Sequence, residues 1–274
     1  MKTLRIMLLL ATVGLQCLGE DHDLPTPYKT ETNKWSFTGS ALFMSRYYGT
    51  IFGGIFYDGP MYWWDVIGAR EDRIGRLTLD LSIGQKMDRL NRFNADGGNE
   101  YDFTVTYTFK PIGPKRFPVI FEVSTCFLAL VPLQTIKDDA WSKSVRVDFP
   151  ILADRKEGSL FQPYFQAYHY NAIGGLGDKG WFLYAGAFRD QPLHCSLFGN
   201  PLKLNLDYRT GYCVQAYGGK SGLEYHRLTL SLPIHKGKWT FVPAVIGQIP
   251  NSSGRTFVHD NPGFYGTLAI THPL

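Results

Sequence analysis

The sequence lacks the features that mark several common protein classes. After the N-terminal segment, no apolar stretch approaches the roughly 20 residues that a transmembrane helix needs, which argues against a helical membrane protein. The four cysteines are too few and too widely spaced for a disulfide framework or a zinc site. Once the N-terminal segment is removed, at most one bridge, between Cys195 and Cys213, is conceivable, and Cys126 stays single. We expect no metal and no cofactor.

The net charge is also small. Lys2 and Arg5 precede an apolar run and then small residues up to Gly19, which is the architecture of a signal peptide. We predict a signal peptide over 1–19, a periplasmic N-terminal segment over 20–34 and a single domain over 35–274. Without the signal peptide, 26 basic residues face 24 acidic ones, so the formal net charge falls from +4 to +2. This balance does not indicate a nucleic-acid partner.

Aromatic residues and glycines are plentiful instead, at 15% and 29 residues, and polar and apolar residues alternate. The segment EYDFTVTYTF, residues 100–109, alternates strictly, which marks a half-buried strand. Segments of this kind, bounded by turn residues, predict twelve strands with almost no helix. The predicted strands are 35–47, 61–71, 76–86, 100–110, 117–128, 143–152, 161–170, 180–190, 202–213, 224–234, 239–248 and 263–274.

These strands are about twice the usual length of about 5–6 residues, and close to the 9–11 or so that cross a bilayer. The connections after odd strands are longer than those after even strands, as expected for a barrel with periplasmic termini. The connection 191–201 breaks this pattern. Aromatic residues near strand ends are typical of girdles at both membrane interfaces; they are Trp35, Tyr47, Tyr62 to Trp64, Tyr101, Trp181, Trp239, Phe264 and Tyr265.

We therefore predict an all-β fold, a single closed antiparallel up-and-down transmembrane β-barrel of about 12 strands, with the apolar side chains facing lipid. The alternative is a soluble lipocalin-like barrel, in which the apolar side chains would face an inner cavity. The positions of Leu77, Leu79 and Leu204, against those of Thr104 and Asn205, distinguish the two.

Four segments carry a family resemblance: SRYYGTIF with DGPMYWWDV, then NEYDFTVTYTF, then GWFLYAGAF and the closing GFYGTLAI. Across most of the mature chain, the sequence resembles the TorF-like family of bacterial outer-membrane β-barrel channels. The resemblance implies a twelve-stranded barrel with a signal peptide and a transport role. Two departures are Trp63-Trp64-Asp65, where a more polar strand entry is expected, and the ending Pro273-Leu274, where many such barrels end in an aromatic residue.

The polar sides of the strands supply a set of charged residues that we expect to line the lumen. They either form cross-strand ion pairs in a narrow barrel or make a polar path that selects solutes. Glu100 and Asp102, two residues apart on one face, are close enough to perturb each other or to bind a cation. The predicted lumen-lining residues are Arg76, Asp80, Glu100, Asp102, Glu122, Arg146, Asp148, Lys203, Asp207, Arg209 and Arg227.

No catalytic residue is predicted. The histidines are scattered, and the nearest serine partner, Ser196 beside His194, falls in a turn. The sequence favours a narrow outer-membrane channel for passive passage of small polar solutes or ions, with lipid and these solutes as its partners. A structural or adhesive barrel without conductance is the alternative within the membrane, and the oligomeric state is open.

Overall fold

The computed structural model describes most of the chain after residue 33. Among these residues there is no helix with the length and hydropathy of a membrane span. The described ranges are 34–48, 55–57, 59–86, 99–113, 118–131, 138–150, 160–174, 179–214, 221–251 and 263–274. The predicted signal peptide and nearly all of the predicted N-terminal segment over 20–34 lie outside them.

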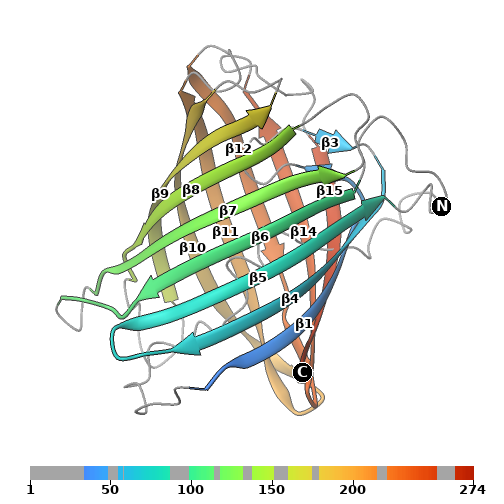
Figure 1. The fold of residues 1–274 in the computed structure, drawn as a ribbon. Coiled ribbons are helices and arrows are strands. Elements are labelled where there is room, and N and C mark those ends of the chain that lie inside the picture. Colours follow the sequence, from blue (N-terminus) through green and yellow to red (C-terminus); the bar gives the residue numbers. More distant parts are fainter. Residues whose placement is uncertain are drawn as a thin grey trace.

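Strands make up the fold (Figure 1). Each of the twelve predicted strands corresponds to one strand of the structure, and three short strands were not predicted. The strands are β1 (Ser36–Met44), β2 (Tyr47–Tyr48), β3 (Ile55–Tyr57), β4 (Met61–Glu71), β5 (Gly75–Lys86), β6 (Asn99–Phe109), β7 (Ile120–Val131), β8 (Asp138–Asp148), β9 (Leu160–Gly174), β10 (Gly180–Leu197), β11 (Asn200–Val214), β12 (Gly222–Ser231), β13 (Ile234–Lys236), β14 (Trp239–Pro250) and β15 (Gly263–Pro273).

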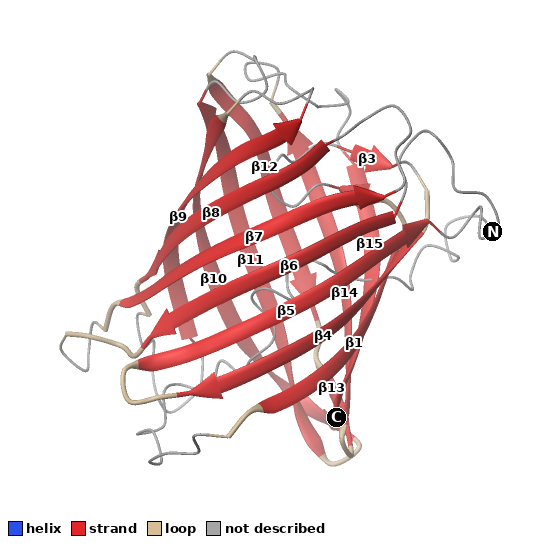
Figure 2. Cartoon of the chain, viewed as in Figure 1, coloured by secondary structure: helices blue, strands red, loops and turns tan. Residues whose placement is uncertain are grey.

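Twelve of these strands close into an antiparallel barrel (Figure 2). Each long strand pairs with the next one along the chain, and the two ends of the chain meet where β1 pairs with β15, from Thr38 opposite Pro273 to Met44 opposite Thr267. The pairing of β12 with β14 completes the ring. Closure leaves none of the twelve strands at an open edge, which is the condition for a sheet to cross hydrocarbon. The predicted fold is confirmed.

The extra strands lie in the connections. β2 and β3 pair with each other between β1 and β4. β13 pairs with the start of β14, with Ile234 opposite Phe241 and Lys236 opposite Trp239, so the expected single strand 224–234 is interrupted at Leu232 and Pro233. Proline lacks the N–H that a ladder position requires, which accounts for the interruption.

The exception to the alternation of connection lengths was a boundary error. The expected connection 191–201 is mostly strand, because β10 and β11 are joined by a two-residue turn at Phe198 and Gly199. Both turn residues have positive φ, 53° and 81°, as in the tight turns that suit the twist of a hairpin. The register of β10 with β11 shifts between Pro192 and Ser196. The even connection is therefore short, as expected for a membrane barrel.

The boundaries of β8 were also wrong: the strand covers Asp138–Asp148, whereas 143–152 was expected. The apolar run after Asp148 extended the predicted strand, but Pro150 lies in the connection that follows. At the other end, two aspartates belong to the strand although they are typical of loops.

None of the three described cysteines forms a disulfide bond. Cys195 lies near the β10–β11 turn, whereas Cys213 is opposite Phe182 near the other end of the same hairpin. This separation excludes the bridge that the sequence left open.

Candidate functional site: the interior of the barrel

The two faces of each strand differ in exposure and in polarity. On one face Leu81, Phe103 and Val145 are 49%, 46% and 49% exposed, whereas Thr104 and Asn205 on the other face are 5% and 8% exposed. Because the sheet is closed, the buried face is the inner one. The apolar side chains of the opening segment 100–109 therefore point outward, and the polar ones point into the barrel.

Aromatic side chains on the outer face lie near both ends of the strands. Trp64, Trp181 and Phe264 lie at one end, and Trp35 and Trp239 at the other, all on the outside and at least 38% exposed. This is the arrangement of two aromatic girdles.

Two residues expected in the girdles have a different position. Trp63 and Tyr265 are only 4% and 1% exposed, because they alternate with the outward Trp64 and Phe264 and point into the barrel. The side chain of Tyr47 lies outside the described part of the structure.

The register places all eleven predicted lumen residues on the inner face. Paired residues of neighbouring antiparallel strands share a face. A residue that is paired with a buried inner residue therefore also points into the barrel, and this can be followed from strand to strand. Asp80 is opposite the buried Thr104, and Arg227 is opposite the buried Arg209. The remaining assignments follow from Arg76 opposite Thr108, Glu100 opposite Gly84, Asp102 opposite Ser82, Glu122 opposite Arg146, Asp148 opposite Tyr164, Lys203 opposite Pro192 and Asp207 opposite Phe188.

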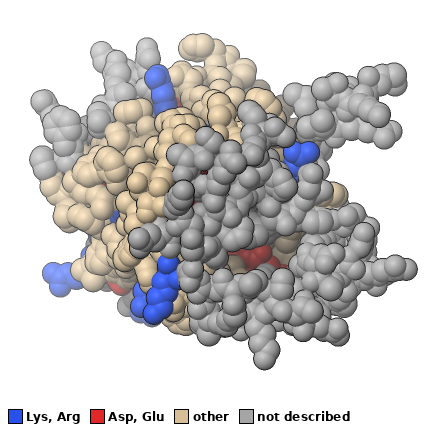
Figure 3. Space-filling model, turned by 90° about the horizontal axis from the view of Figure 1, so that it is seen from above, with Lys and Arg blue, Asp and Glu red and all other residues tan. Residues whose placement is uncertain are grey.

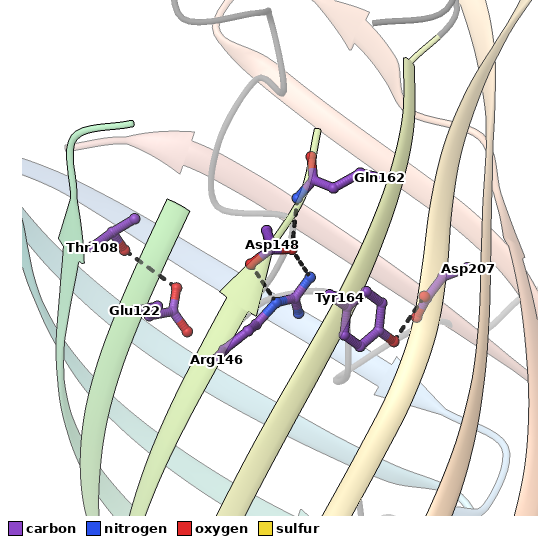
Figure 4. A network of polar contacts seen from close by, with 7 residues as sticks. All are labelled: Thr108, Glu122, Arg146, Asp148, Gln162, Tyr164 and Asp207. Carbon is purple, nitrogen blue, oxygen red and sulfur yellow. Dashed lines mark hydrogen bonds and ion pairs between the residues drawn. The ribbon is translucent and has the colours of Figure 1, made fainter. Parts of the chain in front are cut away.

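A polar network joins several of these residues on one side of the interior (Figure 4). Arg146 Nη2 lies 2.7 Å from Asp148 Oδ1, and its Nε donates to Oδ2 at 2.9 Å. Gln162 Nε2 donates to the same Asp148 Oδ1 at 2.7 Å from the next strand. The Arg146 guanidinium also lies over the ring of Tyr164, 4.0 Å from its centroid. This ion pair thus runs along one strand, and a neutral amide makes the cross-strand contact.

Tyr164 reaches across a whole strand (Figure 4). From β9 its hydroxyl donates to Asp207 on β11 at 3.0 Å, passing over Gly186 of β10. A Cβ at Gly186 would stand 2.4 Å from the Tyr164 ring and 2.6 Å from the backbone oxygen of Tyr208. Glycine at this position is therefore what allows the tyrosine to lie flat against the inner wall.

Four carboxylates of β4, β5 and β6 form what we call the acidic wall: Asp65, Asp80, Glu100 and Asp102. Their side chains share the inner face and are near enough to interact electrostatically. Ser82 donates to Asp80 Oδ1 at 3.2 Å. Figure 3 looks onto the end of the barrel that carries the long connections. Acidic atoms are visible there in a hollow. Within the described ranges no group of three potential ligands could hold a metal ion.

Two arginines of β11 and β12 form a contrasting site, the arginine pair Arg209 and Arg227. They are opposite each other in the register and are 7% and 1% exposed. Arg227 Nε donates to Gln248 Oε1 at 2.8 Å. The guanidinium of Arg227 lies 4.9 Å from the centroid of Tyr225, and that of Arg209 lies 5.1 Å from the centroid of Tyr184. Aromatic faces therefore support both cations within the barrel.

Other parts of the interior are apolar and closely packed. Leu42, Trp63, Phe182, Tyr225 and Tyr265 all point inward, and none is more than 4% exposed. Side chains thus fill much of the cross-section, which is expected for a barrel of intermediate strand number.

Several interior residues were missed by the sequence reasoning. Asp65 was expected at a strand entry, but it is opposite Ser82 and belongs to the acidic wall. Asp65 alternates with the outward Trp64 and Val66, and this pattern indicates an inward position. The pattern is hard to recognise in the sequence because Trp63, which also points inward, is apolar. Tyr184 and Tyr225, which also point into the barrel, were not among the predicted lumen residues either.

Comparisons with known proteins identify the fold. No protein-family model and no curated protein matches the sequence. The structure of the COG4313 outer membrane channel from Pseudomonas putida F1 is similar, with a TM-score of 0.51, 9% identity, and coverage of 91% of this chain and 99% of that one. LpxR from Salmonella typhimurium gives a TM-score of 0.49 at 8% identity, over 86% and 99% of the two chains. The transport unit of the autotransporter AIDA-I from Escherichia coli gives 0.44 at 10% identity, over 95% of each chain.

The chain thus has the fold of bacterial outer-membrane β-barrels.

Proposed function

We propose that this protein is a narrow outer-membrane channel for passive passage of small polar solutes or ions. The observation that carries the proposal is the division of one closed sheet into an apolar outside and a charged inside. Large apolar patches on a protein surface mark contact with a protein or a membrane, and charged side chains along an enclosed path select the solutes that enter.

The same division supports a location in the bacterial outer membrane, with lipid around the barrel. The start of β1 and the end of β15 would then both lie on the periplasmic side. The even connections share one end of the barrel with the first residue of β1 and the last residue of β15. In outer-membrane barrels the periplasmic turns are the short ones. A signal peptide over 1–19, removed on export, is part of this proposal.

We also propose kinship with the TorF-like channels, which the strand segments resemble. The fold shared with the COG4313 outer membrane channel supports this proposal. The protein is proposed to act without catalysis, because His194 and Ser196 are exposed beside the β10–β11 turn, outside the charged interior.

Reconstitution tests the proposal. Purified protein in planar bilayers is expected to conduct ions, and replacing Asp80 or Arg209 with Ala is expected to shift the ratio of cation to anion permeability in opposite directions. Loss of a carboxylate favours anions, and loss of a guanidinium favours cations. Silence of the wild-type protein across a wide range of voltage would refute a conducting channel.

A barrel without conductance is the second candidate, and the close packing of the interior favours it. A structural or adhesive barrel would remain silent in bilayers while the connection 87–98 stays accessible to protease on intact cells. Protection of that connection would refute an adhesive role at the cell surface.

In a soluble lipocalin-like protein, the apolar side chains of the strands would point into the barrel and the polar side chains would point outward. The outward Leu81 and Phe103 and the inward Thr104 and Asn205 contradict it. Cell fractionation gives the corresponding test: recovery with outer-membrane vesicles, and a gel mobility that changes on boiling, are expected of the membrane barrel.

A further inference from the structure

The acidic wall and the arginine pair stand on opposite sides of the barrel. Going around the closed sheet in either direction, β5 and β11 are six strands apart, and so are β6 and β12. Asp80 and Asp102 therefore face the side of the interior that holds Arg209 and Arg227.

The two groups also lie at similar depths. Asp65 and Asp102 lie a few residues after Met61 and Asn99, the first residues of β4 and β6. These strand ends are at the end of the barrel that carries the long connections. Arg227 follows Gly222 by a similar number of residues. The four carboxylates of the acidic wall thus lie on one side of this level, and the two guanidinium groups lie on the other, on strands that also carry the carboxylates Asp207 and Glu224. The separation of the acidic wall from the guanidinium groups sets up an electric field across the path.

Arg227 and Asp65 each have buried polar atoms that make no hydrogen bond with any described residue. Arg227 is 1% exposed, and its Nη1 and Nη2 have no hydrogen-bond partner among the described residues, whereas its Nε donates to Gln248. Asp65 is 6% exposed, and its Oδ2 accepts no hydrogen bond from the part of the chain that the structure describes. A buried donor or acceptor of a charged group that makes no hydrogen bond is unfavourable, so these atoms favour a ligand group of opposite charge.

We propose that this level of the interior binds small zwitterionic solutes during passage, with the anionic group at the arginine pair and an ammonium group at the acidic wall. The inference rests on the proposed channel function. A simple anion would be attracted by one wall and repelled by the other, and the same holds for a simple cation. A solute that carries both charges is stabilised by both walls when it is oriented across the field.

Swelling of proteoliposomes tests the proposal with two solutes of similar size, zwitterionic γ-aminobutyrate and neutral erythritol. We expect γ-aminobutyrate to enter about tenfold faster, the lower end of the effect of a focused field on association. Equal rates would overturn the zwitterion proposal and leave the channel standing. Entry of neither solute would refute the channel, and this inference with it.

Variants locate the preference. Arg227→Gln and Asp65→Asn are each expected to bring the ratio of the two rates close to one. Lys143→Gln, which removes an exposed charge on the outer face of β8, is the matched control and should keep the wild-type ratio. A preference that survives in both interior variants would overturn the assignment.

A measurement on the wild-type protein covers the case in which a variant does not fold. γ-Aminobutyrate added to a planar bilayer should reduce the single-channel current in a concentration-dependent way, and erythritol at the same concentration should not. Equal effects of the two solutes would overturn the proposal.

Discussion

The outer face of the barrel is mainly apolar on every long strand, whereas the inner face changes character from strand to strand. Outside, most residues of the long strands are apolar, with aromatic residues toward the ends and a few charges such as Lys143 and Arg189. Inside, an acidic wall on β4 to β6 is followed by the Arg146–Asp148 network on β8 and by the arginine pair on β11 and β12. Lipid makes one demand on all outward positions, but each inward position meets different side chains. Substitutions on the two faces should therefore follow different rules.

The largest effect is expected for a charge placed on the outer face. Leu81 lies near the middle of β5 and is 49% exposed, so Leu81→Arg should lower the free energy of unfolding from bilayers by about 3 kcal/mol. Denaturant titration in lipid vesicles, followed by gel mobility before and after boiling, measures it. Leu81→Met is the control and should cost less than about 1.5 kcal/mol. Equal stability of the two variants would mean that this face does not meet hydrocarbon.

On the inner face, close approach matters more than polarity. Gly186→Ala should destabilise the barrel by about 2 kcal/mol through overpacking, because the added Cβ meets the Tyr164 ring and the backbone of Tyr208. Ala187→Val, one residue along and on the outer face, should be nearly neutral in the same titration. A neutral Gly186→Ala would show that Tyr164 does not lie over this glycine.

Removing charge from the inner network should have a moderate effect. Asp148→Asn keeps the shape of the side chain but weakens its bonds with Arg146 and Gln162, at a cost of about 1.5 kcal/mol. Gln162→Ala in the same background measures the coupling in a double-mutant cycle. Strictly additive effects of the two substitutions would contradict a shared network.

The smallest effect is expected outside the barrel wall, in the β4–β5 turn. The backbone N–H of Ile74, with the Tyr107 hydroxyl and the N–H of Gly75, lowers the pKa of Asp72 from its ordinary value of 3.8. The ionised form thus stabilises the fold above the unfolded pKa, and this contribution is lost as the pH falls through the lower folded pKa. Asp72→Asn should be slightly less stable at neutral pH, and the difference should vanish in acid. A difference that is independent of pH would contradict the shift.

The contrast between the faces explains what the sequence could predict. All twelve long strands were found, because the apolar alternation on the outer face has one cause along the whole chain. The acidic residues of β6 were placed correctly inside for the same reason. Asp65 was missed because the inward Trp63 interrupts the polar alternation, and an inner face tolerates this when neighbouring side chains fill the space.

The geometry of the β10–β11 turn is a second feature that the sequence did not predict. The hairpin at Phe198 and Gly199 lies within 191–201, which was predicted as a connection. Phenylalanine at positive φ is uncommon, so no local pattern predicts a tight turn at this place. The opposition of the acidic wall and the arginine pair depends on the number of strands between them, and it becomes visible only when the ring is closed.

The pairing of β1 with β15 makes completion of the barrel the last possible step of assembly. These two strands are the most distant in the sequence, whereas each other pair of wall strands is joined locally or nearly so. Contacts between distant segments form slowly because a long chain must be ordered first. A chain that stops before residue 263 would leave the edges of β1 and β14 unpaired, and unpaired backbone groups are not tolerated in hydrocarbon, so such a chain could not insert as a complete barrel.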